Sequence, residues 1–209
     1  MTAAAFEEIY RKDQRAPWDQ DGPTPFVVEL EREGYIRGAV LDAGCGTGEN
    51  ALYLASRGHE VFALDGAPTA IERAREKART RGIDVPFQLA DARDLAGYTD
   101  RFDTVIDIGL FHVFDEEEDR LRYAASLQRA CRPGALVHLL CFNANNDFDA
   151  TIPRPRGCGT HPVDEAELRR AFGAGWTWES FTEVTGRSAA PGGGARRFWL
   201  LRVRKASGV

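Results

Sequence analysis

The chain has 209 residues, of which 43% are hydrophobic and 28% are charged, enough apolar material for one sizeable buried core. Its formal net charge of −5 argues against a nucleic-acid partner, because proteins bind the phosphate backbone through a basic face. No apolar stretch approaches the roughly 20 residues that span a bilayer, and residues 1–11 lack a signal-type apolar run, so we expect a single-domain cytoplasmic protein that binds no membrane.

The amino-terminal part is predicted to stand apart from the rest of the fold. Residues 3–11 and 25–33 have the pattern of two helices, and the segment RAPWDQDGPTP joins them. Such a segment is an unusual addition to a nucleotide-binding core. We therefore expect residues 1–35 to form a lid over a ligand-binding site of that core.

From residue 39 onward, short apolar runs rich in branched side chains alternate with segments of helical period. This alternation is typical of a parallel sheet that is covered by helices on both faces. The predicted strands are residues 39–42, 61–65, 86–89, 104–108, 136–141, 177–184 and 197–203. The predicted helices between them are residues 49–57, 69–81 and 117–131. A last helix begins with a capping box of Asp164 and Glu167 and runs through Phe172.

The last two strands follow each other across the glycine-rich segment SAAPGGGA, so they should form a hairpin with the final strand antiparallel to its neighbours. The fold class is thus α/β: a Rossmann-like, doubly wound, seven-stranded sheet with an antiparallel last strand and amino-terminal lid helices. Within one domain, residues 38–142 are expected to form the cofactor-binding core. Residues 143–209 are expected to supply a substrate-side loop, a helix and the terminal hairpin.

The strongest motif is VLDAGCGTGENALYLA (Val40 to Ala55), in which an apolar strand leads through Gly44, Gly46 and Gly48 into a helix. Glycines let the loop turn sharply and bring backbone N–H groups close to a ligand. The GxGxG spacing differs from the GxGxxG of dinucleotide sites, and a carboxylate at the helix start would repel a phosphate. The acids Asp42 and Glu49 therefore suit the cationic S-adenosylmethionine (SAM) better than NAD.

Two further acids end predicted strands. Asp65, followed by Gly66, lies about 21 positions beyond Gly44, an offset at which an acid meets adenosine ribose hydroxyls. Asp91, followed by Ala92, ends the third strand and could accept a hydrogen bond from the adenine amino group. Each aspartate could instead serve as a turn or capping residue.

Together with the fourth-strand segment FDTVIDIGLFHVF, these motifs resemble the successive motifs of class I SAM-dependent methyltransferases over essentially the whole chain. The resemblance implies that Asp42, Gly44 and Gly46 surround the methionine moiety and that Asp65 binds the ribose. It further implies that Asp91 and Ala92 contact the adenine. The backbone near Asp107 would receive the SAM amine.

A narrower resemblance rests on PWDQDGPTP, GLFHVF and RPGALVHLLCF. These segments are similar to a bacterial group of small-molecule methyltransferases near the thiopurine and tellurite-resistance enzymes, which includes mycobacterial methyltransferases of heterocyclic quinolone-type toxins. A PWD-like entry also occurs in plant halide and thiol methyltransferases. By this likeness Trp18 and Asp19 lie over the cofactor with Tyr10 nearby, although Trp18 could be an ordinary packing aromatic.

Methyl transfer from a sulfonium is an in-line displacement, so the protein mainly aligns the reactants. His112 follows the fourth strand and is our candidate to orient or deprotonate the acceptor, with a packed histidine as the alternative reading. An aromatic pocket with a loop wall and a rim histidine is expected to bind the acceptor. Its candidate residues, besides Tyr10, are Phe111, Phe114, Phe142, Asn143 and His161.

Several alternatives stay open from the sequence alone. These are an NAD-dependent oxidoreductase, a SAM-binding protein without catalysis, an enzyme acting on thiols, halides or chalcogens, and a protein or RNA methyltransferase. The four cysteines are widely separated and form no CxxC pair, so no metal site is expected. The sequence leaves open whether O, N or S is methylated and whether the protein is a monomer or a homodimer.

Overall fold

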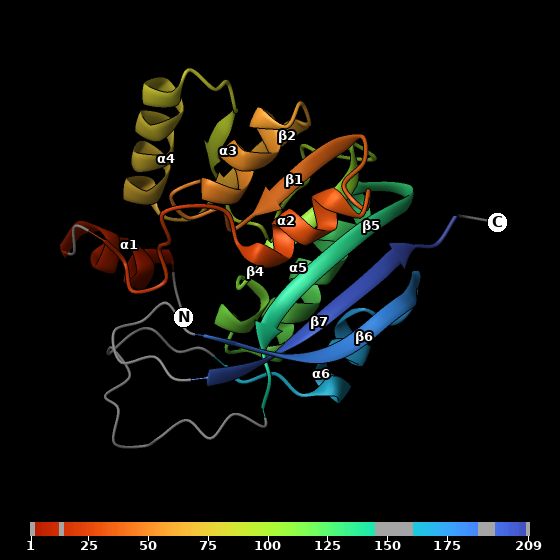
Figure 1. Ribbon diagram of the computed structural model, residues 1–209. Coiled ribbons are helices and arrows are strands. Elements are labelled where there is room, and N and C mark those ends of the chain that lie inside the picture. Colours follow the sequence, from red (N-terminus) through yellow and green to blue (C-terminus); the bar gives the residue numbers. More distant parts are fainter. Residues whose placement is uncertain (1–2, 13–14, 145–160, 188–194, 208–209) are drawn as a thin grey trace.

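The computed structural model describes residues 3–12, 15–144, 161–187 and 195–207. Seven strands form one sheet in the order β3-β2-β1-β4-β5-β7-β6 (Figure 1). The strands are β1 (Ala39–Ala43), β2 (Glu60–Asp65), β3 (Phe87–Leu89), β4 (Phe102–Ile108), β5 (Cys131–Phe142), β6 (Trp176–Arg187) and β7 (Ala195–Lys205). The helices are α1 (Ala3–Lys12), α2 (Pro25–Arg32), α3 (Glu49–Ser56), α4 (Pro68–Arg81), α5 (Glu117–Ala130) and α6 (Glu165–Ala171), with a short 3₁₀ turn η1 (Phe111–Val113).

The predicted fold class is confirmed. Strands β1 to β5 pair in parallel, and β7 lies antiparallel between β5 and β6. Two expectations differ in detail: β5 begins at Cys131 rather than residue 136, and β6 and β7 are longer than predicted because they pair with each other along almost their whole length. The predicted hairpin connection and most of the expected loop wall lie at residues 188–194 and 145–160, outside the described residues.

Local sequence explains where the main elements begin and end. All five residues of β1 are buried because helices cover both faces of the sheet there. Helix α4 begins with Pro68 and ends at Gly82, whose φ of +63° suits glycine. Helix α6 begins with the predicted capping box, in which Asp164 accepts the N–H of Glu167 and the Glu167 side chain accepts the N–H of Asp164.

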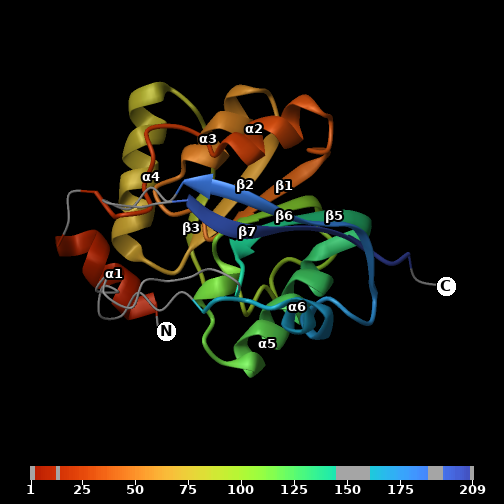
Figure 2. The ribbon, with the colours of Figure 1, turned by 60° about the horizontal axis from the view of Figure 1, so that its bottom comes forward.

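The core lies in two layers, one on each face of the sheet (Figure 2). Helices α5 and α6 cover one face, over buried residues such as Leu139 and Tyr123. Helices α2, α3 and α4 cover the other face, over Val40 and Ile106. A smaller cluster joins α1 to the start of α4 through Tyr10 and Ala70. This last contact places the amino-terminal helix beside the carboxyl edge of β1 and β2.

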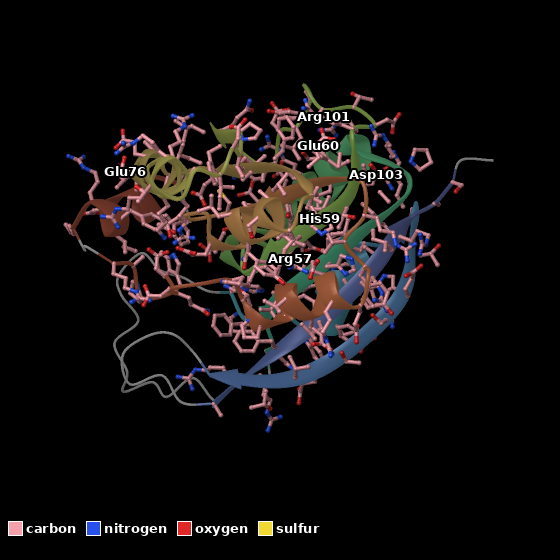
Figure 3. All side chains as sticks on the ribbon, turned by 45° about the horizontal axis from the view of Figure 1, so that its top comes forward. Arg57, His59, Glu60, Glu76, Arg101 and Asp103 are labelled. Carbon is pink, nitrogen blue, oxygen red and sulfur yellow. The ribbon has the colours of Figure 1, made fainter. Side chains whose placement is uncertain are left out.

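The opposite, amino-terminal edge of the sheet is lined by charged side chains. Figure 3 shows Glu60, Arg101 and Asp103 close together where β2 and β4 begin. Asp103 pairs with Arg132, and the Arg101 guanidinium lies over the Phe62 ring at 3.8 Å. In the described ranges no helix combines the length and apolarity needed to cross a bilayer.

Candidate functional site

The loop after β1 is held in a conformation that only glycine adopts easily. Gly44, Gly46 and Gly48 all have positive φ, between +54° and +86°. Added side chains would also collide, because a Cβ on Gly44 would lie 2.9 Å from Leu110 and one on Gly48 would lie 2.8 Å from the Phe87 ring. The glycines thus make room for protein neighbours as well as for a ligand.

The backbone N–H groups of this loop are largely used within the protein. Those of Gly44 and Cys45 both donate to the Leu64 carbonyl at 2.9 Å, and that of Gly48 donates to Cys45. The Gly46 N–H donates to the Asp65 carboxylate at 2.8 Å. This differs from our expectation that the N–H groups approach a ligand. A loop whose donors are already paired is poorly suited to hold a pyrophosphate.

Two buried carboxyl groups lie beneath this loop. Burial, reinforced by the charge of Asp65, raises the pKa of Asp42 to about 8, and one buried oxygen of Asp42 has no hydrogen-bond partner among the described residues. Asp65 accepts the N–H groups of Gly46 and Ala67, each at 2.8 Å, while burial raises its pKa. A buried pair of carboxyl groups, one of them partly unsatisfied among the described residues, favours a cationic ligand.

The side chain of Asp107 faces the core, whereas the prediction concerned the backbone near this residue. Its carboxylate turns into the core and accepts the N–H groups of Leu110 and Phe111 and the hydroxyl of Tyr123. Burial raises its pKa to about 7. The side chain therefore shapes the turn after β4.

The acid at the start of α3 does not face the glycine loop as an unpaired charge. Glu49 is paired with Lys77 and with Arg81, both at 2.8 Å. Glu49 therefore adds little negative charge to the site, because two cations neutralise it. Asp42, which is buried, remains the acid that favours a cationic ligand.

Asp91 lies at the end of β3, as predicted, with its side chain 47% exposed. Arg93 binds its carboxylate through Nε at 2.9 Å and Nη2 at 2.7 Å, and these hydrogen bonds lower the pKa of Asp91. The side chain of Ala92 is buried in the core. Asp91 thus stays charged and is oriented by Arg93.

The amino-terminal segment reaches over the glycine loop. The Trp18 indole donates to the Tyr10 hydroxyl at 2.8 Å, and this hydroxyl lies 3.0 Å from where a Cβ on Gly46 would be. Tyr10 is only 3% exposed, and burial followed by the charge of Asp65 raises its pKa. Asp19 accepts the Thr47 hydroxyl at 3.3 Å. Tyr10, predicted both for the acceptor side and near Trp18 over the cofactor, therefore lies beside the glycine loop.

Helix α1 is anchored at the start of α4. The Glu7 carboxylate accepts both the N–H of Thr69 at 2.9 Å and its hydroxyl at 2.7 Å. A negative charge here also complements the amino-terminal end of the α4 dipole. The predicted lid segment is thus attached to α4, and its Ala3 lies beside Gly66.

His112 lies in η1, directly after the carboxyl end of β4. Its Nδ1 accepts the N–H of Phe142 at 3.1 Å, and its ring packs on the Phe142 ring with centroids 4.6 Å apart. The Cε1 and Nε2 edge of the imidazole faces Gly109. Burial, then the neighbouring His161, lowers the pKa of His112 to about 3, so the ring is neutral at physiological pH.

The other residues predicted for the acceptor side separate into two groups. Phe111 and Phe114 lie in the core under α5, with 0% and 7% exposure, because η1 turns them toward Tyr123. Both rings thus pack against the α5 side of the core. Asn143 is fully buried and donates to Glu183. Phe142 is half-buried at the carboxyl end of β5 and keeps its predicted position.

His161, whose side chain is 32% exposed, belongs to a polar network that the sequence did not indicate. Its N–H donates to the His112 carbonyl and its Nε2 contacts Glu167, both at 2.7 Å. Glu167 pairs with Arg120 at 2.8 Å, and Arg120 donates to the carbonyls of Phe114 and Asp115. The network fixes the backbone on both sides of His112.

Phe198 of β7, which the sequence did not indicate as a site residue, stacks on Phe142 with ring centroids 4.8 Å apart. Nothing in its local pattern distinguishes it from other alternating strand residues. No cluster of three or more metal-ligating side chains occurs in the part of the chain that the structure describes.

Comparison with known families supports the class of fold and activity. A family model described as "Methyltransferase domain" matches residues 40–134. The 2-heptyl-1-hydroxyquinolin-4(1H)-one methyltransferase of Mycobacteroides abscessus is 40% identical over 207 residues, which cover 94% of this chain and 88% of that protein.

Solved structures give the same result. One, described as "Conversion of a Disulfide Bond into a Thioacetal Group during Echinomycin Biosynthesis", is 40% identical with a TM-score of 0.86, covering 99% of this chain and 93% of that one. The 1,6-didemethyltoxoflavin-N1-methyltransferase of Burkholderia thailandensis, at 23% identity and a TM-score of 0.71, covers 98% of this chain and 87% of that one and shows the likeness of fold.

Proposed function

The chain belongs to the SAM-dependent methyltransferases, and we propose that it methylates an O, N or S atom of a small, flat heteroaromatic molecule. The observation that carries the acceptor side is the packing of the His112 ring on Phe142 at 4.6 Å, at the shared carboxyl edge of β4 and β5. The turn from Gly109 to His112 starts beside the glycine loop, because Leu110 packs over Gly44. The proposed donor and acceptor sites are therefore adjacent.

The residues around the glycine loop fit the donor. The buried oxygen of Asp42, which no described group contacts by a hydrogen bond, and the raised pKa of this residue suit a cationic ligand. The internally paired loop N–H groups suit a ligand without phosphate. We propose that Asp42, Gly44 and Gly46 lie along the methionine part, Asp65 with Gly66 along the ribose, and Asp91 with Ala92 along the adenine. Trp18 would cover them, and the backbone at Asp107 would meet the amine.

When bound, SAM supplies an electrophilic methyl group on a positively charged sulfur that leaves as a neutral thioether. The protein's part is to hold the acceptor in line, which removes much of the entropic cost of the reaction. Because Nδ1 of His112 accepts the Phe142 N–H, the neutral ring carries its proton on Nε2. Nε2 is therefore a donor, suited to orient the acceptor.

This tautomer decides between the two roles considered for His112. A ring with a pKa of about 3 and an occupied Nδ1 is a poor base near neutral pH. We therefore propose that His112 orients an acceptor that is already ionised or lacks a proton on the attacking atom. Phenolates, ionised N-hydroxyl groups, ring nitrogens without a proton and thiolates have this property.

Two of the similar proteins point to different acceptor atoms. The mycobacterial relative is named for a hydroxyquinolone, whereas the 40% identical structure is described by the conversion of a disulfide bond into a thioacetal group. A sulfur acceptor is therefore the second candidate. The aromatic side chains His112, Phe142 and Phe198, which lie together at this edge, favour the flat heteroaromatic acceptor.

We further propose that the chain forms one domain, with residues 1–35 as lid, 38–142 as donor-binding core and 143–209 as acceptor-side part. We also propose a cytoplasmic location and no nucleic-acid partner, consistent with the net charge of −5. A monomer and a homodimer both remain compatible with the fold.

A panel of acceptors with methyl-labelled SAM tests the proposed function. Hydroxyquinolines and hydroxyquinolones are expected to be labelled faster than thiophenols, alkyl thiols and halides. Preferential labelling of thiols would establish the second candidate instead. If SAM binds but no small molecule is labelled, the protein is a SAM-binding protein and the proposed reaction is wrong.

A further inference from the structure

The loop after β3 lies directly beside the proposed ribose position. Asp65 pairs with Leu89 in the register of β2 and β3, and the N–H of Ala90 donates to the Asp65 carbonyl at 3.1 Å. Asp91, the next residue, is the acid that we propose along the adenine. The two acids therefore follow each other along one edge of the sheet, in the order of the ribose and the base.

One arginine occupies most of the Asp91 carboxylate. Oδ1 accepts both the backbone N–H and the Nε–H of Arg93, each at 2.9 Å, and Oδ2 accepts the Nη2–H at 2.7 Å. Nε also lies 3.1 Å from Oδ2, as the cross-contact of the same two-pronged pair. Each carboxylate oxygen has about two acceptor positions. Oδ1 is thus filled, whereas Oδ2 keeps one position, and the Asp91 side chain is still 47% exposed.

The Arg93 side chain is itself held on its far side. Its Nη1 lies 2.7 Å from the carboxylate of Asp119, in the first turn of α5, and its guanidinium lies 5.7 Å from the centroid of the Phe114 ring. Only 25% of the side chain is exposed. A planar guanidinium that is bound through three nitrogens cannot rotate without breaking an ion pair. The orientation of Arg93 therefore fixes that of Asp91.

The backbone of this loop has anchors other than Arg93. Ala92 and Leu95 are buried, and the Leu95 N–H donates to the Ser126 hydroxyl of α5 at 2.9 Å. Loss of the Arg93 guanidinium should therefore release the Asp91 side chain while the loop keeps its place. The role of the guanidinium can thus be separated from that of the loop.

We propose that Arg93 is a positioning residue, which aims the remaining acceptor position of Asp91 Oδ2 at the 6-amino group of the donor's purine. This inference rests on the proposed function, in which Asp91 lies along the adenine. An ionised carboxylate only accepts hydrogen bonds, so it favours a 6-amino purine and repels the carbonyl of a 6-oxo purine. A carboxylate that rotates freely turns away from that carbonyl toward water, whereas one held by Arg93 keeps the discrimination.

The test compares S-adenosylhomocysteine with S-inosylhomocysteine, which has a 6-carbonyl in place of the 6-amino group. By titration calorimetry the wild-type protein should bind the adenosyl compound at least about tenfold more tightly. Arg93→Met should lower this ratio several-fold, by weakening the adenosyl compound and leaving the inosyl compound little changed. In turnover with SAM, the same variant should raise KM for SAM and leave kcat within about twofold.

Three further variants complete the comparison. Arg122→Met is the matched control, because Arg122 also approaches Asp119, at 3.9 Å, but is 56% exposed; its ratio should be that of the wild type. Arg93→Lys keeps a cation between the two carboxylates without the planar fork, so it should lower the ratio less than Arg93→Met, and it replaces that variant should methionine prevent folding. Asp91→Asn exchanges one acceptor oxygen for a donor and should lower the ratio furthest.

The outcomes separate the inference from the proposed function. Equal weakening of both compounds in the Arg93 variants, with a lowered ratio in Asp91→Asn, would overturn the inference, because Arg93 would then only join the loop to α5. That result would leave the adenine position intact. Equal affinity of the wild-type protein for the two compounds would overturn the inference together with the proposed adenine position. Failure of both compounds to bind would count against the proposed function itself.

Discussion

The N–H of Phe142 donates to Nδ1 of His112 across 3.1 Å, and this bond links the carboxyl end of β5 to the turn after β4. The bond fixes both the orientation of the imidazole and its tautomer. It leaves Nε2 as the only ring nitrogen able to contact an acceptor. The residue thus gains a role as hydrogen-bond donor and loses that of a base near neutral pH.

The pH dependence of methyl transfer should therefore follow the acceptor. Because the pKa of His112 is lowered to about 3, the ring does not titrate between pH 5 and 9. Profiles of kcat/KM for two hydroxyquinolines of different acidity should show apparent pKa values that differ as the free acceptors do. A common pKa near 6 to 7 for both acceptors, absent in His112→Gln, would restore the base.

Substitution of His112 should act on turnover rather than on donor binding. We expect His112→Ala to lower kcat by about tenfold, the value of one hydrogen bond, with an unchanged Kd for SAM. His112→Gln keeps a side-chain N–H donor and should retain more activity than the alanine variant. Equal losses in both variants would show that packing on Phe142 is what matters.

Binding of SAM should release protons at pH 7. Without ligand, Asp42 has a pKa of about 8 and is mostly protonated, whereas a cation beside it would favour its ionised form. Calorimetry in buffers of different ionisation enthalpy should detect up to about one proton released per SAM, and less in Asp42→Asn. No dependence on the buffer would mean that Asp42 does not face the cation.

The same carboxyl groups predict how the stability of the ligand-free protein varies with pH. Burial raises the folded-state pKa of Asp42 to about 8 and of Asp107 to about 7, so their contribution to stability is present below pH ~4 and is lost progressively as the pH rises to these folded-state values. His112 and His138, with pKa values lowered to about 3, act in the opposite direction and lose their contribution as the pH falls below about 6.5.

Denaturant unfolding should show that the unfolding free energy falls by on the order of 2 kcal/mol from pH 6.5 to 8.5, and that Asp42→Asn reduces this fall. A flat profile would contradict it.

The buried ion pair of Arg120 and Glu167 should be important for stability. Their side chains are 6% and 11% exposed, so Arg120→Met removes the cation beside Glu167 and the donor to the Phe114 and Asp115 carbonyls and should cost about 3 kcal/mol of unfolding free energy. Arg170→Met is the control, because the Arg170 to Glu117 pair is about half exposed and should cost under ~1 kcal/mol. Similar costs for the two variants would mean that Arg120 is not isolated from water.

Much of this arrangement could be predicted from the sequence because it depends on local patterns. The apolar runs gave the strands, the glycine spacing gave the loop after β1, and Asp164 with Glu167 gave the start of α6. Asp42 and Asp65 end up beside the loop because parallel strands bring their carboxyl ends to one edge.

The remaining features depend on contacts between distant segments. The 3₁₀ turn directs Phe111 and His112 to different sides, which alternation along a strand does not indicate. Glu49 is neutralised by Lys77 and Arg81, two helix residues whose reach depends on how α3 and α4 pack. Phe198 meets Phe142 only through the antiparallel register of β5 and β7. None of these relationships has a local sequence signal.

Titration calorimetry of the purified protein with SAM, with S-adenosylhomocysteine and with NAD is the most direct test of the central claim, that the acidic glycine loop holds a cationic, phosphate-free adenosine ligand. Saturable binding of SAM and its demethylated product, with none of NAD, is predicted, and Asp65→Ala should weaken SAM binding at least about tenfold. Binding of NAD without binding of SAM would contradict the claim.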